Sequence, residues 1–211
     1  MRRTLAVMLL GALCTVTAIA QTPAAPAAAS NKVMSWKAGD VEAMGKDQMK
    51  VITTENAKIA VTLVDMWKEA TAVRIQVTNL GSDPLAAPPD AFTLVAKGDT
   101  IAAVPADVLM KKIKSRAENE AETVGSNSMR YAAPNSAGEQ DERNRIRSEG
   151  TRKAEYIRDS ALPAALQPRF QVIGHVYFPY LKKRDEVLVR VTMGGTTYEF
   201  PFQKSDIHPA Y

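Results

Sequence analysis

Residues 187–202, VLVRVTMGGTTYEFPF, decide the fold of this 211-residue chain. Apolar side chains occupy every second position on both sides of a glycine pair: Val187, Val189 and Val191, then Tyr198, Phe200 and Phe202. A period of two is typical of a β-strand that buries one face. Because a Gly-Gly pair allows the positive φ angles of a two-residue turn, we predict a β-hairpin around Gly194 and Gly195.

The same alternation predicts strands on the N-terminal side of this hairpin. It covers residues 59–64 and 73–77, and a further strand over 173–178 is predicted to end at Pro179. Residues 92–95 and 101–104 flank Lys97-Gly98-Asp99-Thr100, which predicts a second hairpin. These segments indicate a mainly β fold.

Between the two groups of strands the pattern becomes helical. Residues 105–124 and 139–161 are rich in good helix formers, and Pro105 suits the opening of a helix. Leu109, Ile113 and Ala117 fall at i, i+4 and i+8, which predicts a thin apolar stripe facing the sheet. We predict a helical or partly disordered insertion at about 106–163, with residues 125–138 as the loop between the helices.

Strands before and after one insertion, short turns and no alternation of strands with helices indicate the fold class. We predict an immunoglobulin-like antiparallel β-sandwich that forms a single domain over residues 33–211. The exposed edge strands of such a sandwich can also add a strand from a partner.

The first twenty residues have the three parts of a secretory signal peptide. Arg2 and Arg3 precede the apolar residues 5–19, and Ala18-Ile19-Ala20 fits a signal-peptidase site. We expect cleavage after Ala20 and a periplasmic or extracellular location. An uncleaved membrane anchor is the alternative. A transmembrane helix needs about 20 apolar residues, and the apolar run 5–19 is shorter than that. Residues 21–32, rich in Ala and Pro, predict a flexible linker.

Cleavage of the leader changes what the composition implies. It removes Cys14, the single cysteine, so the mature chain is expected to have no disulfide, no thiolate catalysis and no cysteine metal site. It also removes Arg2 and Arg3, so that 25 basic residues face 23 acidic ones and the net charge falls from +4 to +2. So balanced a chain is not expected to bind nucleic acid or an anionic membrane surface.

Few residues suit hydrolytic chemistry. The two histidines, His175 and His208, are the only imidazole bases, and no Gly-x-Ser-x-Gly elbow accompanies them. Asp65 lies on the same predicted strand face as Leu63, where burial would raise its pKa, although an acid at a strand end usually meets solvent. Glu139, Asp141 and Glu142 are better explained as the acidic first turn of a helix.

Two other clusters are candidate binding sites. Met44 and Met49 together with His175 are a weak hint of a soft metal ion, but methionine more often fills a core. The basic run is either an anion site or one face of an ion-paired helix, and it comprises Arg143, Arg145, Arg147, Arg152 and Lys153. Its i, i+4 pairs favour the ion-paired helix: Glu139–Arg143, Asp141–Arg145 and Glu149–Lys153.

Part of the chain resembles the immunoglobulin-like secreted bacterial domains grouped as domain of unknown function 4352. The resemblance rests on residues 73–95 and on Leu166-Gln167-Pro168 followed by 174–179, about half of the mature chain. Arg169 stands where those domains have a glycine. The resemblance implies an extracytoplasmic accessory or interaction module, and it brings no catalytic residue to this chain.

These observations lead to one expectation and two alternatives. We expect a non-catalytic secreted or periplasmic binding module, with no catalytic, cofactor-binding or metal-binding residue and no cofactor. Its partner is expected to be another envelope or extracellular protein, bound through the insertion. A cell-envelope assembly or secretion-system component is the first alternative, and a hydrolase of cell-wall or sugar substrates is the second.

Overall fold

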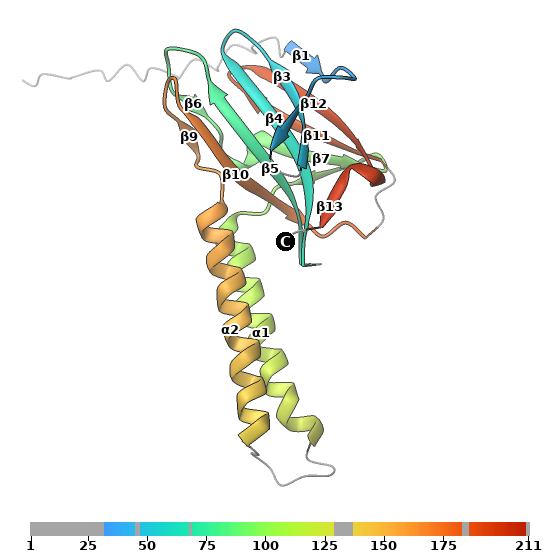
Figure 1. The fold of residues 1–211 in the computed structure, drawn as a ribbon, viewed down its shortest axis with the longest axis vertical. Helices are drawn as coiled ribbons and strands as arrows, with labels where there is room; N and C mark the ends of the chain where they lie inside the picture. The colour runs from blue at the N-terminus through green and yellow to red at the C-terminus, as the bar shows by residue number, and fades with distance from the viewer. Residues whose placement is uncertain (1–31, 45–46, 68, 129–136, 183–185, 210–211) are drawn as a thin grey trace, which may run out of the picture.

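A computed structural model describes the structure of residues 32–44, 47–67, 69–128, 137–182 and 186–209. The predicted signal peptide and nearly all of the predicted linker lie outside the described residues. The described chain forms two packed β-sheets from which a pair of long helices projects (Figure 1).

The first sheet has the strand order β1-β12-β11-β7-β8. Its strands are β1 (Lys32–Ser35), β7 (Phe92–Ala96), β8 (Asp99–Ala102), β11 (Glu186–Met193) and β12 (Thr196–Gln203). Both predicted hairpins are confirmed, because β11 pairs antiparallel with β12 and β7 with β8. Gly194 and Gly195 have φ angles of 56° and 74°, as the two-residue turn between β11 and β12 requires.

The second sheet has the order β10-β5-β4-β3-β2, and β13 pairs with the far part of β4. Its strands are β2 (Val41–Met44), β3 (Asp47–Thr53), β4 (Ala57–Met66), β5 (Ala70–Asn79), β10 (Gln171–Pro179) and β13 (Ile207–Pro209). The short β6 (Leu85–Ala86) and β9 (Ala165–Leu166) pair separately, and two single turns of 3-10 helix complete the fold, η1 (Pro89–Ala91) and η2 (Lys204–Asp206).

The core lies between the inner faces of the two sheets. On the second sheet these faces carry alternate residues of β4, β5 and β10, and on the first sheet alternate residues of β7, β11 and β12. Fully buried members include Ile59, Val61, Leu63, Val73, Ile75, Val77, Leu94, Val189, Val191 and Phe200. The alternation in the sequence therefore arises from the sandwich, and the predicted β-sandwich with a helical insertion is confirmed.

The insertion consists of α1 (Ala106–Ser128) and α2 (Ala137–Ser160). Both helices extend into residues 125–138, which the sequence predicts as a loop, so that boundary is wrong. Gly125 and Asn127 are weak helix formers, but pairing with a neighbouring helix outweighs such intrinsic preferences.

Candidate functional site

The two helices form an antiparallel hairpin held by one narrow apolar seam. The seam consists of Leu109, Ile113, Ala117 and Ala121 on α1 and Ile146, Gly150, Ala154 and Ile157 on α2. Spacings of three and four residues place each set on one helix face, as predicted for Leu109, Ile113 and Ala117. The large side chains on α1 lie near the sandwich and the alanines lie further out.

Gly150 allows the helices to approach closely in the middle of the seam. A Cβ atom built on Gly150 would lie 2.4 Å from the Cβ of Ala117, well inside van der Waals contact. Only glycine fits this position without moving a helix. The hairpin is therefore a tight, rigid pair over this part of its length.

The base of the hairpin covers the outer face of the second sheet. Leu109, Ile113 and Ile157 pack there against five buried residues of β4, β5 and β10, namely Val64, Met66, Ala70, Ala72 and Tyr177. The Tyr177 hydroxyl lies 2.8 Å from Ser160 Oγ and donates to the Ile157 carbonyl at 3.2 Å. Burial raises the pKa of Tyr177 to about 12, so this phenol stays protonated and anchors the end of α2.

The chain segments that enter and leave the hairpin close part of the free edge of β10. The Val104 N–H donates to the Tyr177 carbonyl at 2.7 Å, and the Leu162 N–H donates to the His175 carbonyl at 3.0 Å. Gly174 makes room for this, because a Cβ there would lie 2.7 Å from Leu162 Cα. This stretch of β10 is therefore closed to strand addition by a partner.

Further from the base, charged side chains cover the hairpin and bind one another. Glu149 binds Lys153 at 2.7 Å, which confirms that predicted pair. Arg145 instead binds Glu142 at 2.6 Å and Glu149 at 3.7 Å, and Arg147 crosses to Glu118 of α1 at 2.6 Å. The ion-paired interpretation of the basic run is thus the better one for these three cations.

The pKa values of the three acids agree with these contacts. The hydrogen bond from Arg147 lowers the pKa of Glu118, and the one from Arg145 lowers the pKa of Glu142. The hydrogen bond from Lys153 likewise lowers the pKa of Glu149. All three carboxylates remain ionised at neutral pH, so they balance the positive charges of Arg145, Arg147 and Lys153.

A groove of about 250 Å³ runs between α1, α2 and the turn that joins β4 to β5. Trp67 lies at the end of the groove next to the sandwich. Its ring is edge-on to Tyr156, with ring centroids 5.6 Å apart, and Lys153 Nζ lies 5.8 Å from its ring centroid. Arg116 closes this end by binding Glu69 at 2.9 Å. The cations and anions that line the groove balance: Arg116, Arg145 and Lys153 with Glu69, Glu120 and Glu149.

His175 lies beneath α2, on the outer face of β10. Its ring centroid is 6.0 Å from that of Tyr156 and 6.2 Å from that of Tyr177. Burial, with a smaller contribution from Arg74, lowers the pKa of His175 to about 4, although a main-chain hydrogen bond with Ser160 opposes the shift. His175 is therefore a neutral packing residue at physiological pH, not a general base poised near pH 7.

The other candidate residues do not meet at one site. His208 lies on β13 beside Val64 of β4, so β4 and β5 separate it from His175 on β10. Met49 is buried with Val51 and Ala60, and it is also separated from His175 by two strands, about 14 Å at usual strand spacings. His175 and Met49 cannot bind one metal ion.

The remaining candidates lie close to where the sequence places them. Asp65 is the penultimate residue of β4, on the face of Leu63, and lies half-buried opposite Thr71 of β5. Glu139 lies in the first turn of α2, as expected, whereas Asp141 and Glu142 lie in the second turn, because the helix begins at Ala137. The side chain of Met44 lies outside the described residues. Across the described ranges, no group of three or more His, Cys, Asp or Glu side chains is arranged to hold a metal ion.

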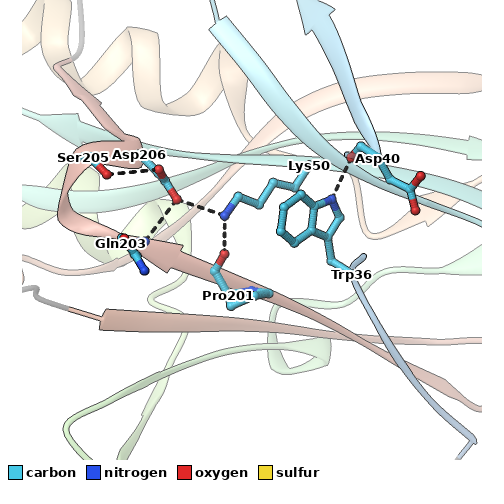
Figure 2. Close-up of polar contacts among 7 residues, drawn as sticks. All are labelled: Trp36, Asp40, Lys50, Pro201, Gln203, Ser205 and Asp206. Carbon is cyan, nitrogen blue, oxygen red and sulfur yellow. Dashed lines mark hydrogen bonds and ion pairs between the residues drawn. The ribbon is translucent and has the colours of Figure 1, made fainter. Parts of the chain in front are cut away.

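Sequence reasoning missed a polar cluster centred on Lys50, between β3 of the second sheet and β12 of the first (Figure 2). Lys50 Nζ donates to the Pro201 carbonyl and binds Asp206 at 2.9 Å. It also lies 4.5 Å and 4.6 Å from the ring centroids of Trp36 and Phe202. The signal that could have found it is a lysine on the inward face of the alternating segment Met49-Lys50-Val51-Ile52.

The Lys50 cluster fastens the C-terminal segment to the sandwich. Asp206 also accepts the Gln203 N–H at 3.1 Å, and Trp36 Nε1 donates to the Asp40 carbonyl at 2.6 Å (Figure 2). Burial raises the pKa of Asp206, but the hydrogen bonds from Lys50, Gln203 and Ser205 outweigh it and leave the pKa below its usual value. With its donors and acceptors engaged, the cluster stabilises the fold rather than offering a reactive amine.

The fold is similar to that of a solved structure. No family model and no curated protein matches the chain. The crystal structure of YcdA, a candidate lipoprotein from Bacillus subtilis, is similar with a TM-score of 0.39 and 13% identity. The match covers 74% of this chain and 39% of YcdA, so the chain spans about two fifths of that protein. Within the described residues, no helix is long and apolar enough to cross a membrane.

Proposed function

We propose that the protein is a non-catalytic binding module of the cell envelope or the extracellular space, with the helical hairpin as its partner-binding arm. The observation that carries this proposal is that the hairpin extends away from the sandwich (Figure 1). Within the described residues, its buried apolar packing on the sheets is at the base, at Leu109, Ile113 and Ile157. Beyond Ala117 and Gly150, the buried apolar cluster of the described hairpin contains residues of the two helices alone.

The far half of the hairpin therefore adds little to the core that stabilises the sandwich. Ordering a segment costs about 1–2 kcal/mol per residue in backbone entropy, which its own packing must offset. Binding a partner would explain why the chain keeps this long, solvated hairpin despite that cost. The signal-peptide pattern and the resemblance to secreted interaction domains support a partner in the envelope or outside the cell.

The test is to shorten the hairpin without removing its base. Replacing residues 118–149 with a short Gly/Ser linker joins α1 to α2 where Ala117 and Gly150 already touch, and it keeps Leu109, Ile113 and Ile157 on the sheet. The shortened and full-length proteins are immobilised and exposed to periplasmic extract and culture fluid from the source cells. We expect the full-length protein to retain a partner that the shortened protein does not.

Val41→Ser is a matched control on the opposite side of the sandwich. Val41 is 50% exposed on β2, the strand at the far edge of the sheet from β10. This variant should retain the same partner as the unmodified protein. If the shortened protein captures every protein that the full chain captures, the hairpin is not the binding arm.

A further inference from the structure

A groove between the hairpin and the turn that joins β4 to β5 is built from three segments distant in the sequence. The turn contributes Trp67 and Glu69, and the walls are charged side chains of α1 and α2. Its floor is the buried seam of the hairpin, at Ile113, Ala117, Ile146 and Gly150. Drug-sized pockets hold about 300–1,000 Å³, whereas this groove holds about 250 Å³, so it suits a small molecule.

Trp67 occupies a backbone position that favours glycine. Its φ angle is 50°, in the left-handed region, and the Glu69 N–H closes the turn by donating to the Met66 carbonyl at 2.8 Å. A Cβ atom crowds the backbone in this conformation, so such turns usually contain glycine or asparagine. The chain instead holds its largest type of side chain here and places the indole in the groove. Residues held in strained conformations cluster at functional sites, including ligand sites.

The groove carries no net charge. Three cations and three anions line it: Arg116, Arg145 and Lys153 with Glu69, Glu120 and Glu149. Arg116 binds Glu69 at 2.9 Å, and Lys153 binds Glu149 at 2.7 Å. A charged ligand would meet like charges or break one of these ion pairs, and either event weakens binding. The lining therefore favours a ligand without net charge.

The lining side chains keep hydrogen-bonding capacity beyond these ion pairs. A guanidinium group has five N–H donors, and a carboxylate can accept about four hydrogen bonds. Arg145 Nη1 lies 3.7 Å from Glu149, too far for a hydrogen bond. Glu120 acts on Arg145 electrostatically, but it has no ion-pair partner among the residues that the structure describes. The groove thus offers both donors and acceptors to a neutral polar molecule.

We propose that this groove binds a neutral carbohydrate, with one or two pyranose rings held between Trp67 and the charged walls. A pyranose ring has C–H groups on its faces and hydroxyl groups on its edges. The C–H hydrogens carry partial positive charge and suit the negative face of an indole ring. Each hydroxyl both donates and accepts, so it can bind a guanidinium and a carboxylate together. Trp67, Arg145 and Glu120 are the residues on which this site depends most.

Purified full-length protein tests this site without any protein partner. In Trp36→Phe, Trp67 is the single tryptophan of the chain, and an aromatic ring remains beside Lys50. Titrating this variant with cellobiose, maltose and di-N-acetylchitobiose should change the fluorescence emission of Trp67. We expect at least one of these neutral disaccharides to bind with a Kd of about 1 mM or tighter. Raising the salt from about 0.05 to 0.5 M should change that Kd less than about twofold, because the ligand carries no charge to be screened.

Substitutions in the groove locate the site by calorimetry. Trp67→Ala should raise the Kd of the bound disaccharide at least about tenfold, and Trp67→Phe, which keeps an aromatic face, should raise it less. Glu120→Ala should raise it about threefold or more, because an acceptor for the hydroxyl groups is lost. Glu122→Ala is the matched control, since Glu122 is exposed two residues further along α1 and does not line the groove. Circular dichroism of each variant shows that the hairpin remains folded.

Three results would overturn this proposal. One is a protein that binds none of the three disaccharides at about 10 mM, and another is a Trp67→Ala variant that binds them as the unmodified protein does. The third is glucosamine or glucuronic acid binding at least about tenfold tighter than the neutral disaccharides, which would assign the groove to an ion. None of these results bears on capture of a protein by the hairpin, so the two proposals fail independently.

Discussion

Arg169 occupies a backbone position suited to glycine. Its φ angle is 64°, in the left-handed region, and its N–H donates to the Asn79 carbonyl at 2.9 Å just before β10 begins. A side chain with a Cβ atom costs about 1 kcal/mol or more in this conformation, whereas glycine adopts it freely. We expect Arg169→Gly to raise the free energy of unfolding by about 1 kcal/mol, measured by thermal denaturation.

Arg169→Ala separates backbone strain from contacts of the guanidinium group. Alanine keeps the Cβ atom, so this variant should show no comparable gain. An unfolding free energy that falls in Arg169→Gly, or rises equally in both variants, would contradict the assignment of strain to this residue.

His175 makes the stability of the protein depend on pH. Its pKa is lowered to about 4 in the folded state, against 6.5 in an unfolded chain. The folded state therefore binds fewer protons, so the contribution of His175 is complete above pH 6.5 and is lost as the pH falls through 4. A shift of this size corresponds to a contribution on the order of 3 kcal/mol.

We expect His175→Gln to remove this dependence while keeping a polar side chain of similar size. Urea unfolding of both proteins at pH 7, 5.5 and 4 measures it, since the unmodified protein should lose stability on acidification faster than the variant. Equal slopes in the two proteins would show that other groups control the acid response.

The helix pair depends on the absence of a side chain at Gly150. Gly150→Ala would place a Cβ atom 2.4 Å from Ala117 Cβ and push α1 and α2 apart. We expect a loss of about 1–3 kcal/mol in the free energy of unfolding, because overpacked contacts are relieved only by moving a helix. Thermal denaturation followed by circular dichroism at a helical wavelength measures the loss.

Gly138 provides the matched control within the same helix. A Cβ atom at Gly138 would have no atom within 4 Å, and this residue is exposed near the start of α2. Gly138→Ala should therefore be neutral or should stabilise the helix by about 1 kcal/mol. If both alanine variants behave alike, close packing at Gly150 is not the cause.

The elements that the sequence predicted share a property that the missed ones lack. β4, β5, β11 and β12 alternate because each buries one whole face in the core, and that burial leaves a period of two in the sequence. β2 and β3 lie toward the edge of the sheet, and β3 carries Lys50 on its inward face, which breaks the apolar pattern. Such strands form because they pair with strands distant in the sequence, and this pairing leaves little pattern in their own residues.

In the whole molecule, the hairpin likewise has features that the local sequence predicts and features that only contacts across the chain determine. The sequence predicted two helices and their thin apolar stripe, because local spacing determines which residues share a helix face. It could not predict that the stripe leaves the sheet after Ile113, or that Arg147 binds Glu118 across the pair. The first feature depends on how the hairpin base is held against β10, through Tyr177 and Ser160, and the second depends on the register of the two helices.

The hairpin base and the sandwich should therefore unfold as one unit, and the far half should be dispensable for stability. Removing all of residues 106–163 would expose the buried outer face of the second sheet at Val64, Met66, Ala72 and Tyr177. At about 25 cal/mol per Å² of apolar surface, uncovering several large side chains costs several kcal/mol and leaves an exposed apolar patch that favours aggregation. We expect this protein to aggregate and to bind a hydrophobic dye.

The variant with only residues 118–149 replaced keeps that face covered, because Leu109, Ile113 and Ile157 remain in place. We expect it to stay soluble and to unfold within about 1 kcal/mol of the full chain, since the segment it loses packs in a separate cluster. Dye binding and thermal denaturation of the two deletion proteins measure the difference. If the smaller deletion destabilises the sandwich as much as the larger one does, then the far half of the hairpin supports the fold, and its projection from the sandwich needs an explanation other than partner binding.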